Sequence, residues 1–348
     1  MERAFSECNL NPLSCVTSQF DPDPDFPTVV FPNPEEKGAL DAAMAYANEQ
    51  GCDLILANDP DADRLAVAEK NPGGAGSGWT VFSGNQIGQL LGHWQIKKWK
   101  ESGKNAADAV VLTTVVSSRM LQAIAVKEGA GYTDTLTGFK WIGNKAIELA
   151  GQGKRVLLTY EEALGYCCGD ILFDKDGIHA AVVFAAMAGY YRNQHQQSIA
   201  QVMETLYLKY GRFVSYNSYI FCHDTALTDR IFSRIRTGGD GGAYWKVVAG
   251  VQVARIVDVT TGYDSGADSG KAELPTTPES HMIMFTFANG VTITLRTSGT
   301  EPKIKYYTEL AGDDGQEASA VKDRLVGFVD AAVEELLQPT LHQLQRAP

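Results

Sequence analysis

Three aspartates at alternate positions between two apolar runs constrain this chain more than any other feature. The apolar run at 54–57 predicts a buried strand, residues 58–64 form a short polar loop, and a second apolar run follows at 65–68. Alternate carboxylates in such a loop converge on a hard divalent cation such as Mg²⁺. Arg64, directly beside them, indicates that an anion lies next to the metal. The predicted metal ligands are Asp59, Asp61 and Asp63.

Other interpretations of the same loop either fail at single positions or stay open. A solvated acidic turn is the plainest alternative, and the apolar flanks disfavour it. An EF-hand requires Gly at loop position 6 and Glu at position 12, where this chain has Arg64 and Lys70. A phosphatase-type Asp-x-Asp motif after a strand, with Asp59 as the covalent nucleophile, stays open.

Composition limits the class of protein. The 348 residues are 44% apolar, which is enough for two or three domains with separate cores. A formal net charge of −12 disfavours nonspecific binding to nucleic acid or to an acidic membrane, so local positive groups must hold any anionic substrate. The six cysteines form no C-x-x-C pair, and no apolar run reaches about 18 residues. These features predict a cytoplasmic protein without a signal peptide or a membrane span.

The order of predicted elements indicates α/β mixed-sheet domains followed by an α+β domain. Residues 1–32 are expected to form a connecting arm, and 33–80 to hold a helix capped by Asn33, the metal loop and its strands. Strands and helices alternate over 81–210, which predicts a parallel sheet. Longer strand-like runs follow over 211–348, where Asn289-Gly290 predicts a hairpin in a largely antiparallel sheet.

Three further segments could carry chemistry. The loop at 296–302 combines an arginine with Ser, Gly and Thr, so it is either a phosphate cradle or an ordinary hairpin loop. Glu161-Glu162 ends a predicted strand and either accepts hydrogen bonds from sugar hydroxyls or forms a surface pair. Lys140 and Lys175 either meet a phosphate or shuttle a proton, or they are solvated surface lysines.

Five motifs occur in the order found in the α-D-phosphohexomutases, which the chain resembles over residues 21–340. The motifs are Asn58-Asp-Pro-Asp-Ala-Asp-Arg64, Thr137-Gly-Phe-Lys-Trp-Ile-Gly143, Glu161-Glu-Ala-Leu-Gly-Tyr166, Lys175-Asp-Gly177 and Arg296-Thr-Ser-Gly-Thr-Glu-Pro-Lys303. In detail the chain resembles most the branch that contains the phosphopentomutases and the glucose-1,6-bisphosphate synthases. The resemblance implies several domains around a central cleft.

The resemblance also implies a role for each matched position. Asp59, Asp61 and Asp63 would hold Mg²⁺, Arg64 would face the transferring phosphoryl group, and Asp63 would border the substrate. The positions that would contact the sugar phosphate are Thr137, Glu161, Ala163 and Lys175. The positions that would grip the phosphate that is not transferred are Arg296, Ser298, Gly299 and Thr300. Arg64 and Lys140 are the candidate catalytic residues.

The implied activity is phosphoryl transfer on sugar phosphates in carbohydrate metabolism, as in a phosphoglucomutase or a phosphopentomutase. A phosphoserine would give its phosphoryl group to the sugar, and the resulting sugar 1,6-bisphosphate would reorient and return the other one. Mg²⁺ would offset charge on the oxygens during in-line transfer. Glucose-1,6-bisphosphate synthesis is an alternative activity.

Two departures from the family pattern change that expectation. Position 163 is alanine where glucose-specific members carry serine, which removes one hydroxyl contact and argues against a strict glucose preference. The family's Ser-His-Asn-Pro nucleophile loop does not occur in the sequence, and residues 1–20 do not resemble the family. We therefore expect an N-terminally truncated member, which is inactive alone or acts as a noncatalytic sugar-phosphate-binding fragment.

Overall fold

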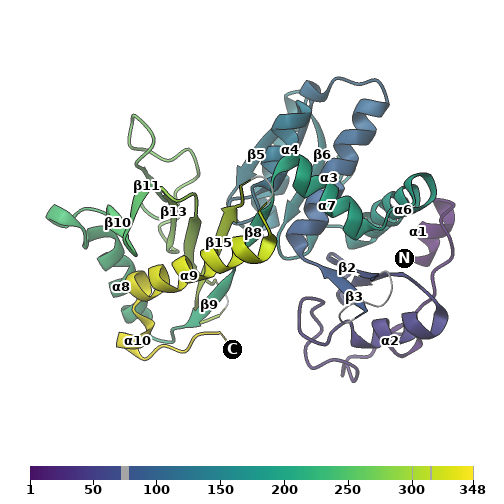
Figure 1. The fold of residues 1–348 in the computed structure, drawn as a ribbon, viewed down its shortest axis with the longest axis horizontal. Helices are drawn as coiled ribbons and strands as arrows, with labels where there is room; N and C mark the ends of the chain where they lie inside the picture. Colours follow the sequence, from purple (N-terminus) through teal and green to yellow (C-terminus); the bar gives the residue numbers. More distant parts are fainter. Residues whose placement is uncertain (72–77, 300, 314–315, 348) are drawn as a thin grey trace. The chain divides into compact units, whose positions relative to one another are not determined.

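The structure is a computed structural model that describes residues 1–71, 78–299, 301–313 and 316–347. The chain forms two compact units, Met1–Tyr210 and Gly211–Pro348, and each is described by itself (Figure 1). Among the described residues, no helix combines the length and the apolar character that crossing a membrane requires.

The first unit contains two sheets with helices packed against them. In chain order its helices and strands are α1 (Glu2–Glu7), α2 (Asp41–Gln50), β1 (Leu54–Asn58), β2 (Leu65–Lys70), β3 (Trp79–Phe82), α3 (Gly84–Glu101), β4 (Ala109–Thr114), α4 (Met120–Glu128), β5 (Gly131–Thr135), α5 (Phe139–Gly151), β6 (Arg155–Glu161), β7 (Gly165–Cys168), α6 (Gly177–His195) and α7 (Ile199–Tyr210).

A three-stranded antiparallel sheet, in the order β1-β2-β3, carries the aspartate loop. Asn58 pairs with Leu65, so residues 59–64 close the hairpin between β1 and β2. The middle strand is buried because the side chains of residues 65–68 are all apolar and are at most 2% exposed. Paired strands and buried apolar side chains therefore hold both ends of the aspartate loop in place.

A four-stranded sheet in the order β5-β4-β6-β7 follows, in which β4 runs parallel to β5 and β6, and β7 is antiparallel to β6. On one face, α5 packs apolar side chains such as Phe139 and Ile142 against Val110 and Leu112. On the other face α3 lies so close that a Cβ at Gly88 would come within 2.6 Å of the Tyr160 ring. The predicted parallel sheet is confirmed, and it places the carboxyl ends of β4 and β6 at one edge.

One carboxylate joins α3, α4 and α7. Glu128 accepts hydrogen bonds from Lys100 Nζ at 2.7 Å, from Lys209 Nζ at 2.6 Å and from the Tyr210 hydroxyl at 2.6 Å. Burial opposes ionisation of this carboxyl, but the three donors outweigh burial and lower the pKa of Glu128 to about 2. The ionised carboxylate thus fixes the end of α7, the last helix of the first unit.

The second unit is built on a largely antiparallel sheet in the order β10-β11-β13-β14-β15-β8, with β9 also paired to β15 and β12 to β11. Helix α9 packs Val321, Leu325 and Val329 into the core that this sheet forms. The elements are β8 (Phe213–Ser215), β9 (Ser218–Phe221), α8 (Thr225–Thr237), β10 (Val247–Val248), β11 (Val251–Asp258), β12 (Tyr263–Asp264), β13 (Met282–Phe287), β14 (Thr292–Thr297), β15 (Lys303–Ala311), α9 (Ala318–Leu337) and α10 (Pro339–His342).

The start of the chain differs from the sequence expectation. Residues 1–32 are not entirely irregular, because Glu2–Glu7 forms α1, which packs near α6 and buries Phe5. The helix expected from Asn33 begins only at Asp41. Gly38 has a left-handed backbone conformation with φ +86°, which is incompatible with a continuous α-helix at that residue. Asn33 accepts a hydrogen bond from the Glu35 N–H in a local turn instead of capping the helix.

Two further boundaries depend on single residues. Helix α5 begins at Phe139, so Lys140 lies on its first turn, and the loop before the helix ends at Gly138 with φ +100°. At the start of the second unit, β8 and β9 are separate strands because Asn217 Oδ1 accepts the Thr308 N–H at 2.9 Å and interrupts the ladder to β15. The predicted hairpin at Asn289-Gly290 is confirmed by the pairing of β13 with β14.

Candidate functional site

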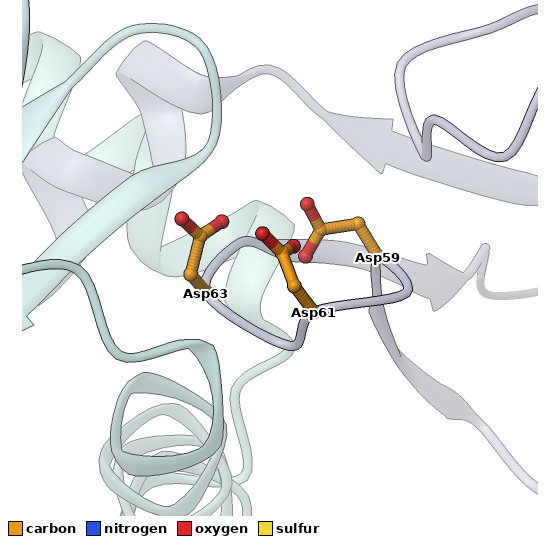
Figure 2. A group of neighbouring side chains, drawn as sticks. All are labelled: Asp59, Asp61 and Asp63. Carbon is orange, nitrogen blue, oxygen red and sulfur yellow. The ribbon is translucent and has the colours of Figure 1, made fainter.

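The three aspartates lie together on the loop between β1 and β2. Figure 2 shows their carboxylates side by side, with Asp63 at one end of the row and Asp59 at the other. One ligand oxygen from each lies within 4.8 Å of those from the other two. The loop turns at Ala62, which has φ +58°, and its N–H donates to the Asp59 carbonyl oxygen at 2.9 Å. The turn brings alternate side chains to one place.

This arrangement fits a hard divalent cation. Mg²⁺ binds oxygens at about 2.0–2.1 Å, so two of its ligands lie at most about 4.2 Å apart. The spread of 4.8 Å is close enough for side-chain rotation to close it. The predicted ligands Asp59, Asp61 and Asp63 are therefore brought together, and their all-carboxylate donor set suits Mg²⁺.

Arg64 is held against this cluster. Its backbone N–H donates to Asp59 Oδ1 at 3.0 Å, its Nε donates to Asp59 Oδ2 at 2.6 Å, and a terminal nitrogen donates to Asn33 Oδ1 at 3.0 Å. Burial of Asp59 opposes its ionisation, but these hydrogen bonds outweigh burial and lower the pKa of Asp59. Hydrogen bonding to Asp59 and repulsion from the neighbouring carboxylates raise the pKa of Asp61, which a bound cation would relieve.

The turn between β6 and β7 packs directly on the metal loop. Leu164, with φ +63°, accepts a hydrogen bond through its carbonyl oxygen from the Leu65 N–H at 3.0 Å, and Arg64 and Gly165 form an isolated β-bridge. At the start of α6, the Gly177 N–H donates to the Ala62 carbonyl oxygen at 3.1 Å. Backbone contacts thus fix three segments from distant parts of the sequence around one point.

Lys175 connects these segments through its ammonium group. Its Nζ lies 3.0 Å from Asp63 Oδ2 and 3.7 Å from Glu161 Oε1. Burial opposes the charged form of Lys175, but both carboxylates outweigh burial and raise its pKa. Burial is also the main reason why the pKa of Glu161 is raised, and Lys175 partly opposes it. Lys175 and Glu161 therefore form part of the same cluster as the metal loop.

The two adjacent glutamates have different partners. Glu161 faces Lys175, whereas Glu162 Oε2 accepts hydrogen bonds from Thr114 Oγ1 at 3.2 Å and Ser117 Oγ at 3.1 Å. A Cβ at Gly84 would come within 1.8 Å of the Glu162 carbonyl oxygen. Glu162 therefore holds the turn against the end of β4, and Glu161 is the member of the pair that faces the cluster.

The remaining candidates of the first unit lie at the carboxyl edge of the parallel sheet. Thr137 follows β5 and is half-buried, and Ala163 is half-buried in the turn between β6 and β7. Lys140 is exposed, with its Nζ 5.7 Å from the centre of the Trp141 ring.

The candidate phosphate loop belongs to the second unit. Arg296 lies near the end of β14, half-buried, with its guanidinium 5.9 Å from the centre of the Tyr307 ring. The Ser298 N–H donates to the Lys303 carbonyl oxygen at 2.9 Å, which narrows the loop at its base, and Gly299 is exposed. Thr300 lies outside the described residues.

Sequence reasoning missed three residues that shape the site. The sequence predicts Asn33 as a helix cap, but its side-chain oxygen accepts a hydrogen bond from the Arg64 guanidinium. Asn58 Nδ2 donates to the Arg64 carbonyl oxygen at 2.6 Å, and Gly177 has no room for a side chain there. The motifs contain Asn58 and Gly177, but the structural need for them appears only when the three segments come together.

Residues 1–74 match the family described as phosphoglucomutase/phosphomannomutase, alpha/beta/alpha domain II, and residues 83–210 match domain III of the same family. The match begins at residue 1, so the expectation that residues 1–20 lie outside the family is wrong. The chain shares its fold with a phosphoglucomutase/phosphomannomutase family protein from Burkholderia thailandensis, at a TM-score of 0.60 and 15% identity over 97% of this chain and 57% of that one.

Curated relatives are more similar in sequence. The chain is 45% identical to human phosphopentomutase and 42% identical to human glucose 1,6-bisphosphate synthase, over 99% of this chain and 56% of each relative. It is 41% identical to a phosphoribomutase of Saccharomyces cerevisiae, over 88% of this chain and 51% of that protein. The chain thus spans about half the length of the curated relatives it matches. It belongs to the phosphoglucomutase/phosphomannomutase family and carries domains II and III of that family.

Proposed function

We propose that this chain provides the metal-binding and sugar-binding parts of a phosphosugar mutase that moves a phosphoryl group between positions of a sugar phosphate. The observation that carries this proposal is one cluster in which the predicted metal ligands meet Lys175 and Glu161. Relatives named phosphopentomutase and phosphoribomutase support a pentose phosphate as the substrate class. Ala163, which has no hydroxyl group to offer a hexose, agrees with that choice.

Within this proposal the residues of the cluster have separate tasks. When bound by Asp59, Asp61 and Asp63, Mg²⁺ would offset negative charge on a transferring phosphoryl group. Arg64 presents a guanidinium that Asp59 and Asn33 hold in place, so it can meet a phosphoryl oxygen with little loss of side-chain freedom. Glu161 is placed to accept hydrogen bonds from sugar hydroxyls, and Lys175 to meet the anionic ligand beside it.

We further propose that Arg296, Ser298, Gly299 and Thr300 bind the phosphate that is not transferred. An arginine fork and the backbone N–H groups of a Ser-Gly-Thr loop suit a phosphate dianion. The loop connects two strands of a sheet that closes within the second unit, so its geometry does not depend on the first unit.

Titration of the purified chain with glucose 1,6-bisphosphate, followed by calorimetry or NMR, tests this assignment. Arg296→Ala should weaken binding about tenfold to a hundredfold, because charge-assisted hydrogen bonds contribute about 1.5–3 kcal/mol each. Arg296→Lys should recover only part of the loss, since an ammonium cannot form a bidentate fork. Arg324→Ala, at an exposed ion pair of the same unit, is the control and should bind like wild type. Equal binding by wild type and Arg296→Ala would refute the role of the loop.

A further inference from the structure

Lys175 lies between a predicted metal ligand, Asp63, and the proposed sugar-binding residue, Glu161. Its Nζ lies 3.0 Å from Asp63 Oδ2 and 3.7 Å from Glu161 Oε1, and its side chain is only 21% exposed. Asp63 stands at one end of the carboxylate row, on the loop that closes the β1–β2 hairpin (Figure 2).

We propose that Lys175 competes with the metal for Asp63. In the metal-free chain the Lys175 ammonium group pairs with Asp63, and when Mg²⁺ binds it turns to Glu161 and the sugar phosphate. This inference rests on the proposed function of the cluster. It adds a coupling between the two ligands, because the metal frees the ammonium group that the sugar phosphate needs.

Electrostatics supports this exchange. The Asp63 carboxylate attracts both an ammonium group and Mg²⁺. The two cations repel each other at short distance, so the binding of one to Asp63 weakens the binding of the other. Arg64 Nε, 4.0 Å from Asp63 Oδ1, already adds positive charge on that side of the aspartate. Glu161 offers Lys175 a second anionic partner without a large movement, since its carboxylate is already 3.7 Å away.

Backbone hydrogen bonds and close packing fix the position of the Lys175 side chain. The Asp176 N–H donates to the Tyr166 carbonyl oxygen at 2.9 Å, and the Gly177 N–H donates to the Ala62 carbonyl oxygen of the metal loop. A Cβ at Gly165 would come within 2.5 Å of Lys175 Cδ, so a glycine leaves the space that the lysine stem fills. The stem is therefore packed along the turn, and only its terminal atoms need to move between the two carboxylates.

Calorimetric titration with MgCl₂ tests the competition. Lys175→Met keeps an unbranched side chain and removes the charge. This variant should bind Mg²⁺ at least about fivefold more tightly than wild type. Lys175→Arg keeps the charge and should stay near wild type. Lys145→Met removes a lysine that pairs with Glu148 on α5, and it should leave the affinity unchanged.

A second readout follows the lysine itself. The side-chain ammonium signal of Lys175 in an NMR spectrum, assigned by its loss in Lys175→Met, should shift when MgCl₂ is added, while the Lys145 signal stays in place. Equal or weaker Mg²⁺ binding by a folded Lys175→Met variant, or an unmoved Lys175 signal at saturating MgCl₂, would overturn the competition. Absence of Mg²⁺ binding by both wild type and Lys175→Met would instead remove the proposed metal site, and this inference with it.

Discussion

Replacing Gly177 with alanine should weaken Mg²⁺ binding about tenfold or more and lower the free energy of unfolding by about 2–3 kcal/mol. A Cβ at this position would lie 2.3 Å from the Arg64 carbonyl oxygen, 2.5 Å from Asn58 Nδ2 and 2.8 Å from the Ala62 carbonyl oxygen. Two of these atoms are backbone atoms of the metal loop. The clash cannot be relieved by rotating a side chain, so the loop itself must move.

Calorimetric titration with MgCl₂ and urea unfolding measure the two effects. Gly189→Ala is a matched control on the same helix, because its Cβ would have nothing within 4 Å. There alanine should leave Mg²⁺ binding unchanged and stabilise the chain by about 0.5–1 kcal/mol through its higher helix propensity. If Gly177→Ala binds Mg²⁺ as well as Gly189→Ala does, the start of α6 does not support the metal loop.

Glu69→Ala is expected to be among the most destabilising substitutions in the first unit, with a loss of about 3–4 kcal/mol. Glu69 lies on β2, which follows the metal loop, and is 5% exposed. Its two carboxylate oxygens accept the backbone N–H groups of Ile199 and Ala200, each at 2.8 Å. These groups begin α7, where the helix dipole also favours a negative charge.

The alanine variant leaves one buried and one half-buried N–H donor without their partner, and this explains the size of the effect. Glu69→Gln keeps the shape but presents an amide to one donor, so it should lose about 2 kcal/mol. Hydrogen exchange of the α7 amides and urea unfolding measure the change. Glu148→Ala, at an exposed carboxylate on α5, should leave both nearly unchanged. Full protection of α7 in Glu69→Ala would show that β2 does not anchor this helix.

Elements whose ends are set by neighbouring residues could be predicted from the sequence. Ser83 before α3 forms a capping box with Gln86, and Gly129 ends α4 with a left-handed backbone, as expected for those residues. The hairpin at Asn289-Gly290 and the hairpin that carries the aspartate loop also follow from local sequence. At these places the short-range pattern and the final structure agree.

Features that depend on contacts between distant segments could not be predicted in the same way. Asn33 has a capping side chain and a proline after it, yet its oxygen holds a guanidinium from 31 positions further along the chain. The segment after Glu161 resembles a loop, but it forms β7 because its residues pair with β6. Glu161 faces Lys175, whereas Glu162 accepts a hydrogen bond from Thr114. The sequence does not indicate which glutamate faces which partner.

The position of Lys175 shows the limit most clearly. The motif Lys175-Asp-Gly177 marks the residue, but only the fold places its ammonium between Asp63 and Glu161, 112 and 14 positions away. The resemblance of this motif to the family predicts that Lys175 contacts the substrate, and the structure adds its contact with the predicted metal ligand Asp63.

Calorimetric titration of the chain with MgCl₂, in wild type and in Asp61→Asn, tests whether the aspartate loop is the metal site. Asp61 is a loop carboxylate beside Asp59 and Asp63 and supports no core side chain, so the substitution should preserve the circular dichroism spectrum and the unfolding transition. We predict a single Mg²⁺ site in wild type. In Asp61→Asn the Mg²⁺ affinity should fall at least about tenfold, because ligand charge determines the affinity of such sites. Equal Mg²⁺ affinity in the two proteins would contradict the assignment of the aspartate loop as the metal site.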